Sequence, residues 1–289
     1  MTTTATPVRA GRPRRNALRN LPLHVLLVLL AVGMLYPLVW MLVSSLRTND
    51  VIFSDPTLLP RALTLDNYVQ GWNAQQHPFS RYFLNSLVVT VGSIVGNLLA
   101  CSLTAYAFAR LTFRLKAFWL AVMLMTIMLP EHVTIVPQYI LFAELGWLNT
   151  FLPLVAPKYF ATEAFFVFLM VQFIRGLPRE IDEAAAIDGC GPFAIYWRII
   201  LPLIVPALAT TAIFTFIWTW NDFFRPLVFL TESELFTVPL AVRLFVDASG
   251  GTDWGALFAM SVLSLVPVLL FFLLGQRYLI NGIATTGFK

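Results

Sequence analysis

The segment Glu183-Ala184-Ala185-Ala186-Ile187-Asp188-Gly189 stands in a charged interruption between two long apolar runs, and Ile199-Ile200-Leu201-Pro202 follows after nine intervening residues. Acidic residues fill the first turns of this segment, where the helix dipole favours negative charge. Its three consecutive alanines are the strongest helix formers, and Gly189 supplies a C-terminal stop. We therefore expect a short, separate helix with a small alanine surface, which suits docking into a cleft better than catalysis.

The spacing of this segment resembles the EAA loop of bacterial ABC importer permeases. Seven residues match every fixed position of that pattern, namely Glu183, Ala184, Ala185, Gly189, Ile199, Leu201 and Pro202. In that family the segment forms a coupling helix, which sits in a groove of a cytoplasmic ATPase subunit. The resemblance implies that these residues couple the chain to an ATPase, and the alternative is a solvated, alanine-rich loop.

The composition places most of the chain in a lipid bilayer. Apolar residues make up 58% of the 289 residues, charged residues make up 12%, and the mean hydropathy is +0.78. A soluble domain carries roughly a quarter charged residues, and this length allows about six spans of about 20 residues each. We expect an all-α integral membrane protein. The resemblance implies an ABC transmembrane type-1 fold with the coupling helix between spans four and five.

The apolar runs divide the chain into five predicted parts. They are a basic cytoplasmic tail (1–20), a first transmembrane helix (21–46), a periplasmic or extracellular segment (47–82), a transmembrane core (83–280) that contains the 178–202 loop, and a cytoplasmic tail (281–289). The other five spans are expected at 83–108, 117 to about 137, 156–175, 199 to about 222, and 254–274. Residues 138–150 and 223–253 are expected to be outer connections.

The distribution of basic residues predicts the orientation. This topology puts 13 of the 19 Lys and Arg residues on one side of the membrane, together with both termini and the Glu183 segment. Because loops rich in Lys and Arg stay in the cytoplasm, both termini and the Glu183 segment are predicted to be cytoplasmic. The protein is thus expected to be a multi-pass component of the cell inner or plasma membrane.

Two sequence details predict how the helices pack and bend. Gly92, Gly96 and Ala100 follow one another at intervals of four residues in the second span, which makes a small-residue stripe for close packing within the bundle. Pro202 and Pro206 are expected to bend the start of the fifth span. Arg179 lies four residues before Glu183 and is a candidate ion-pair partner for it on the same helix.

Polar side chains at membrane depth mark a candidate substrate path, because they are costly there unless they face a polar interior. The candidates are Asn97, Thr104, Glu163, Asn221 and Asp222, with the aromatic Trp218 and Trp220 beside the last two. Aromatic faces next to hydrogen-bonding groups suit sugars, although an interfacial aromatic belt has the same composition. Glu163 could instead form a structural pair with Lys158.

The Trp-Asn-Asp stretch at residues 220–222 resembles a landmark of carbohydrate-type permeases, similar to those of maltose. This favours sugar transport, with Trp218, Asn221, Asp222 and Glu163 as substrate-path residues. The resemblance implies four kinds of partner: a second permease subunit, similar but often not identical; a dimer of cytoplasmic ATPase subunits; an external solute-binding protein; and the lipid bilayer.

The chain carries no Gly-x-x-x-x-Gly-Lys-Ser/Thr phosphate loop, and its three histidines and two cysteines show no metal-ligand spacing. We therefore expect a transport subunit and not an enzyme, without a cofactor or metal of its own. ATP and Mg²⁺ are expected on the partner ATPase. A nucleic-acid role for the basic tail is disfavoured because a membrane span follows it directly.

Three alternatives compete with the sugar-importer interpretation. An ion-coupled secondary transporter often has two related halves, and no internal repeat is evident here. An ABC importer could also carry a solute other than a sugar. A membrane-embedded enzyme would need a cluster of catalytic side chains at membrane depth, whereas the acids and histidines of this chain are scattered.

Overall fold

The computed structural model describes residues 21–55, 57, 63–246 and 251–284. Within these residues the chain is helical and contains no strand, which confirms the predicted all-α class. The first helices are α2 (Leu21–Ser44), α3 (Asp66–Asn73), α4 (Phe79–Arg110), α5 (Lys116–Thr126), α6 (Glu131–Glu144), α7 (Leu152–Val155), η1 (Ala156–Phe160) and α8 (Ala164–Arg175). The predicted tail 1–20 lies outside the described residues.

The second half of the chain begins with the short helix that the sequence predicts. Its elements are α9 (Glu180–Ile187), α10 (Pro192–Ile195), η2 (Tyr196–Ile200), α11 (Leu201–Leu203), α12 (Val205–Trp220), α13 (Phe224–Phe229), η3 (Ser233–Leu235), α14 (Val238–Arg243) and α15 (Trp254–Ala284). The described part of the predicted outer connection 223–253 thus contains three short helical elements.

The number of membrane spans agrees with the prediction of about six. Four helical segments are long and apolar enough to cross a bilayer: Leu21–Ser44, Phe79–Arg110, Leu152–Arg175 and Trp254–Gln276. Two further pairs of helices reach the same length only when each bent pair counts as one span, which brings the number to six among the described residues.

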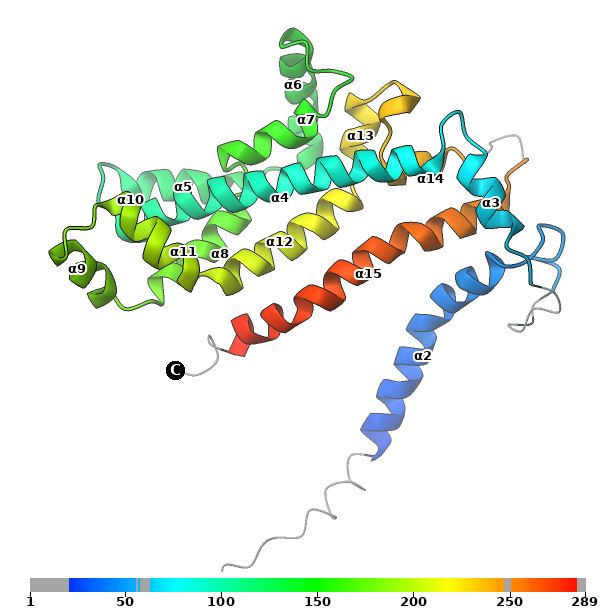
Figure 1. Cartoon of the computed structure of the whole chain (residues 1–289), viewed down its shortest axis with the longest axis horizontal. Coiled ribbons are helices and arrows are strands. Elements are labelled where there is room, and N and C mark those ends of the chain that lie inside the picture. The colour runs from blue at the N-terminus through cyan, green and yellow to red at the C-terminus, as the bar shows by residue number, and fades with distance from the viewer. Residues whose placement is uncertain (1–20, 56, 58–62, 247–250, 285–289) are drawn as a thin grey trace, which may run out of the picture.

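The long helix α4 is the centre of the bundle. It packs against both α8 and α12, and α12 packs in turn against α15. Figure 1 shows that α9 and α10 lie at one end of the bundle, whereas α3 and α14 lie at the opposite end. We call these the α9 end and the α3 end.

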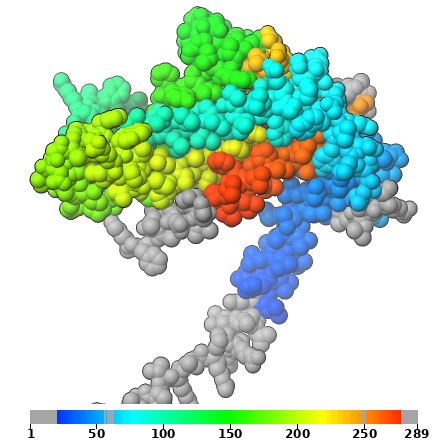
Figure 2. All heavy atoms as spheres, in the orientation of Figure 1, coloured from blue at the N-terminus to red at the C-terminus, as the bar shows by residue number. Residues whose placement is uncertain are grey.

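The first span separates from the rest of the molecule. Ser44, its last residue, is the one buried residue of α2, and Trp40 contacts Phe258 of α15 with ring centroids 5.3 Å apart. Figure 2 shows the remainder of α2 standing away from the packed body. Because this helix is apolar on all sides, its exposed surface suits the hydrocarbon of a bilayer.

The third span is not the single helix that the sequence predicts. Its two halves, α5 and α6, meet at an angle of 100°, and α6 continues to Glu144, into the predicted outer connection. Pro130 precedes α6 with an extended backbone. A proline disfavours the helical conformation of the residue before it and cannot continue a helical hydrogen-bond ladder, so the helix breaks there.

The fourth and fifth spans also differ from the prediction. The fourth is helical from Leu152, four residues before the predicted start, and is interrupted near Ala161, whose φ is +53°. The fifth begins at Pro192 and not near Ile199, and it ends at Trp220. Its two parts meet at 74° around Ile204, between Pro202 and Pro206, which confirms the predicted bend.

The small-residue stripe of α4 packs within the chain, as expected. A Cβ atom on Gly92 would lie 2.9 Å from Val155, and one on Gly96 would lie 2.8 Å from the ring of Tyr159 and 3.1 Å from the backbone of Lys158. The absence of side chains at these positions lets the α7–η1 segment approach α4 closely. This segment carries Lys158, one of the residues of the candidate site.

We expect Gly96→Ala to destabilise the protein, because the added methyl group has no room against Tyr159 and the backbone of Lys158. Overpacking of this kind costs about 1–3 kcal/mol, so the melting temperature in detergent should fall by several degrees. Gly33→Ala in α2 is the matched control, because nothing lies within 4 Å of its Cβ position. Equal melting temperatures for the two variants would contradict the expected clash.

Candidate functional site

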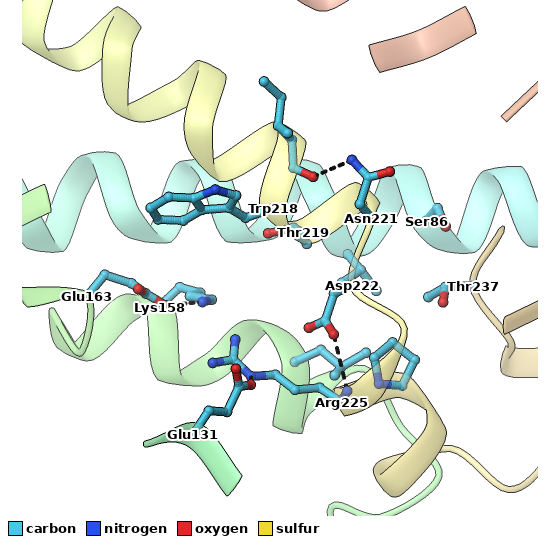
Figure 3. A pocket seen from close by; sticks show the side chains of 14 residues that line it. Ser86, Glu131, Lys158, Glu163, Trp218, Thr219, Asn221, Asp222, Arg225 and Thr237 are labelled. Atoms are coloured by element: carbon cyan, nitrogen blue, oxygen red, sulfur yellow. Dashed lines mark hydrogen bonds and ion pairs between the residues drawn. The ribbon is translucent and has the colours of Figure 1, made fainter. Parts of the chain in front are cut away.

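A polar cavity of about 430 Å³ lies between α4, η1, α12 and α13. Its lining residues are Ser86, Val89, Glu131, Leu154, Lys158, Glu163, Ile217, Trp218, Thr219, Asn221, Asp222, Arg225, Pro226 and Thr237. The structure therefore brings together all four residues that the sequence nominates for the substrate path, although Glu163 is far from the other three along the chain (Figure 3).

The end of α12 presents an aromatic ring and two polar side chains to this cavity. Trp218 is 48% exposed, and its ring stacks on Phe166 with centroids 5.2 Å apart. Asn221 Nδ2 donates to the carbonyl of Ile217 at 2.7 Å, and Asp222 Oδ1 accepts the backbone N–H of Arg225 at 3.2 Å. These contacts fix the orientation of each of the three side chains.

Trp220 has a different role from the one that its sequence neighbours suggest. It is 3% exposed, and its Nε1–H donates to the carbonyl of Ser264 in α15 at 3.0 Å. Residues two apart on a helix face different directions, so Trp220 packs in the core while Trp218 lines the cavity.

Two ion pairs form one wall of the cavity. Lys158 Nζ pairs with Glu163 Oε1, which confirms the structural pairing considered from the sequence. The left-handed conformation of Ala161 interrupts the helix between η1 and α8, and the two paired side chains lie five residues apart across this break. Arg225 Nε of α13 pairs with Glu131 Oε1 of α6 at 2.6 Å.

Sequence reasoning missed Glu131 and Arg225. Glu131 was placed near the outer end of the third span and Arg225 in the outer connection 223–253, and their meeting depends on the sharp bend between α5 and α6. A signal was present in the sequence: Glu131 directly follows Pro130, and Arg225 lies three residues after Asp222. Neither position identifies its partner without the tertiary structure.

The same ion pairs also border a second cavity of about 540 Å³ that lies toward the break between α5 and α6. Glu131, Leu154, Lys158, Glu163 and Arg225 line both cavities. These charged side chains therefore separate two polar spaces, so their charges act on a solute in either one.

Asp222 follows the end of α12 and carries the cavity's third carboxyl group. Burial raises its pKa above the ordinary value, while the positive charge of Arg225 and the hydrogen bond from its backbone work in the opposite direction. Unlike Glu131 and Glu163, Asp222 forms no ion pair with any described residue.

Two further polar candidates lie away from the cavity. Asn97 is buried and donates to Thr215 Oγ1 at 3.0 Å, so it joins α4 to α12. Thr104, also on α4, lines neither of the two cavities. The amide of Asn97 therefore serves the helix bundle and not the candidate path.

The seven motif residues separate into exposed and buried groups. Glu183, Ala184 and Gly189 are exposed on α9 and its C-terminal turn, and Pro202 is exposed beside the bend of the fifth span. Ala185 is buried, and Ile199 and Leu201 pack against the same core cluster. The packed motif residues therefore anchor this segment to the rest of the chain, and the exposed motif residues form part of its surface.

Gly189 ends α9 in the way its position predicts. Its φ is +85°, a left-handed conformation that favours glycine. The Gly189 N–H donates to the carbonyl of Ala186 at 3.1 Å, and the Cys190 N–H donates to that of Ala185 at 2.9 Å. This pair of bonds caps the helix and turns the chain toward α10.

Arg110, at the end of α4, holds α9 in place. Its Nε pairs with Asp182 Oδ2 at 2.7 Å, and its Nη2 donates to the carbonyl of Leu177 at 2.9 Å. Tyr106, one turn earlier, donates to the carbonyl of Pro192 at 3.0 Å. The candidate pair between Arg179 and Glu183 is absent from the described residues, so Asp182 is the acid of α9 that forms an ion pair.

A bundle of broken and bent membrane helices around a polar cavity, with an exposed helix at one end, defines a membrane transport component. Residues 92–284 match the profile of the family described as "Binding-protein-dependent transport system inner membrane component". The chain belongs to this family of ABC transporter permeases.

Relatives align over nearly the whole chain. The probable ABC transporter permease protein YurM of Bacillus subtilis is 35% identical, over 96% of this chain and 92% of its own length. The trehalose/maltose transport system permease protein MalG of Thermococcus litoralis is 32% identical, over 96% and 99%.

One solved structure has the same fold, that of a bacterial ABC transporter involved in the import of the acidic polysaccharide alginate. The TM-score is 0.81 at 22% identity, and the match covers 95% of this chain and all of that one.

Proposed function

We propose that this chain is the permease subunit of a binding-protein-dependent importer for a sugar or oligosaccharide. The observation that carries the proposal is the cavity, whose lining combines the aromatic ring of Trp218 with the polar side chains of Asn221 and Asp222 (Figure 3). Aromatic faces contact the C–H surfaces of sugar rings, and the polar groups bind their hydroxyls. Relatives that are transport permeases for trehalose and maltose, diacetylchitobiose and arabinooligosaccharides support this substrate class.

ATP-driven work would reach this cavity from the α9 end. We infer that Glu183, Ala184 and the turn at Gly189 dock onto a cytoplasmic ATPase dimer, because these residues form the exposed part of the motif. The bent fifth span joins this end of the bundle to Trp218, Asn221 and Asp222. A rigid movement of α9 would therefore be transmitted to the cavity wall.

The remaining partners follow from the same proposal. A second permease subunit would complete the path, and a solute-binding protein would deliver the sugar at the α3 end. Both termini and α9 would then be cytoplasmic, as the distribution of Lys and Arg indicates. ATP and Mg²⁺ would bind to the ATPase, while this chain would act as the transport subunit.

We expect Trp218→Ala to reduce sugar uptake roughly tenfold, the equivalent of about 1.4 kcal/mol, because the ring surface against the sugar is lost. Uptake of labelled maltotriose, chitotriose and arabinotriose is measured in membrane vesicles that contain the whole importer. Trp218→Phe, which retains an aromatic face, should recover part of the loss.

Trp119→Ala is the matched control, because Trp119 is exposed on α5 and lines neither cavity. Melting temperatures of all three variants separate a folding defect from a transport defect. Wild-type vesicles that import a non-sugar solute, such as sn-glycerol 3-phosphate, and none of the saccharides would refute the sugar assignment and leave the permease assignment intact.

A further inference from the structure

The charges that face the cavity come from five different elements. Three are acidic, namely Glu131 on α6, Glu163 before α8 and Asp222 after α12. Two are basic, namely Lys158 on η1 and Arg225 on α13. The described residues of this lining therefore carry one more negative charge than positive charge.

Both basic side chains are already occupied. Arg225 Nε lies 2.6 Å from Glu131 Oε1, and Lys158 is paired with Glu163 while its side chain is only 10% exposed. A solute with its own carboxylate or phosphate would therefore meet two cations whose charges Glu131 and Glu163 already balance. An anion that leaves water without a cationic partner of its own pays a large desolvation penalty.

Asp222 is the exception among the five charges. Its Oδ1 accepts one backbone N–H at 3.2 Å, and none of the described cations lies within ion-pair distance of it. Figure 3 shows its carboxyl group between Trp218, on one side, and Arg225, on the other. An ionised carboxylate in this position can accept hydrogen bonds from solute hydroxyl or ammonium groups, and such charge-assisted bonds are stronger than neutral ones.

We propose that this cavity selects its solute by charge: it admits uncharged and amino-substituted saccharides and excludes saccharides that carry carboxylate, phosphate or sulfate groups. Asp222 determines this preference as the free acceptor, and Glu131 enforces it by occupying Arg225. The inference rests on the proposed function for the substrate class, but the electrostatic preference of the cavity can be measured without any sugar.

The first experiment measures the potential inside the cavity with small charged reagents. Cys101 and Cys190 are replaced by Ala and Ser, and Thr219→Cys places one thiol on the cavity lining. The importer complex in lipid nanodiscs then reacts with a cationic, a neutral and an anionic methanethiosulfonate. Rates are divided by those of the same protein unfolded in detergent, which removes the intrinsic differences between the reagents.

We expect the cationic reagent to react at least tenfold faster than the anionic one after this correction, because a cleft lined by one sign of charge concentrates counter-ions. Asp222→Asn should bring the ratio of the cationic to the anionic reaction rate close to one. Glu131→Gln should also lower it, because this change releases Arg225 toward the anionic reagent. Asp66→Asn, an exposed acid at the start of α3, is the matched control and should leave the ratio unchanged.

Three results of this experiment would overturn the proposal. The first is a ratio of cationic to anionic reaction rates at or below one when Thr219→Cys is the only substitution on the cavity lining. The second is a rate ratio that Asp222→Asn does not change. The third is no reaction with any of the three reagents, because a solute path must admit molecules of this size.

The second experiment compares uptake of maltotriose, chitosan trimer and trigalacturonate by wild type and Glu131→Gln. We expect wild type to import maltotriose, chitosan trimer or both, and to import at least tenfold less trigalacturonate. Glu131→Gln should reduce this difference in uptake. Preferential import of trigalacturonate by wild type would refute the charge selection while supporting sugar import. A third outcome is that none of the saccharides is imported although the Thr219→Cys thiol still reacts faster with the cationic reagent. This outcome would refute the proposed sugar substrate and not the charge selection.

Discussion

Glu183→Lys is expected to reduce ATP-driven uptake at least tenfold, while the protein still folds and inserts into the membrane. Glu183 is exposed on α9 and forms no ion pair within the described residues, so its own chain does not depend on it. Reversal of its charge should therefore act on the docked ATPase and uncouple ATP hydrolysis from transport. The measurements are uptake, ATP hydrolysis and co-purification of the ATPase from the same proteoliposomes.

A second substitution on the same helix separates docking from helix stabilisation. Glu180 is the first residue of α9 and is also exposed. The effect of the helix dipole falls off from the helix terminus, and Glu180 is three residues nearer to the start of α9 than Glu183. Glu180→Lys would therefore be the more damaging change if negative charge only stabilised the helix. Normal uptake by Glu183→Lys with full ATPase association would remove Glu183 from the docking contact.

Arg110→Met should abolish uptake almost completely, because it removes the attachment of α9 to α4. The Arg110–Asp182 pair is mostly buried, with side chains 6% and 18% exposed. Loss of one partner of a buried ion pair costs about 3–5 kcal/mol, and the carbonyl of Leu177 would lose its donor as well. We expect α9 to detach locally, which is measured as faster protease cleavage within residues 176–191 and loss of the ATPase on purification.

The double variant Arg110→Met/Asp182→Leu tests whether the buried charge causes this loss. Replacement of both partners by apolar residues leaves no unpaired charge and is often nearly neutral, so protease resistance should return. Arg114→Met is the matched control in the connection that follows α4, because Arg114 is exposed. Equal protease sensitivity of the single and double variants would show that α9 is held mainly by other contacts, such as the one between Tyr106 and Pro192.

The sequence was a good guide wherever one local property decides the outcome. The short helix at 180–187 follows from acidic residues, alanines and a glycine that occur in the right order. The bend near Ile204 follows from two prolines that flank it. The four predicted path residues do line one cavity, because polar side chains within an apolar bundle avoid lipid and gather around water-accessible space.

The sequence was a poor guide where distant segments decide the outcome. The third span was predicted as one helix, since its apolar run continues through Pro130 and a hydropathy pattern does not register a change of direction. Without this break, Glu131 could not be placed beside Arg225, nor could either be assigned to the candidate path. Ala185 and Glu183 are likewise two residues apart in one motif, but one is buried and the other exposed.

By itself, the sequence determined the class of this protein, the approximate number of its spans and the position of the short helix α9. These depend on apolar runs, helix signals and a fixed spacing, all of which are local along the chain. Only the tertiary structure decided which charges meet, which of them stays unpaired, and which half of the motif faces outward. These outcomes depend on bends of 100° and 74°, which bring together side chains that are far apart in the sequence.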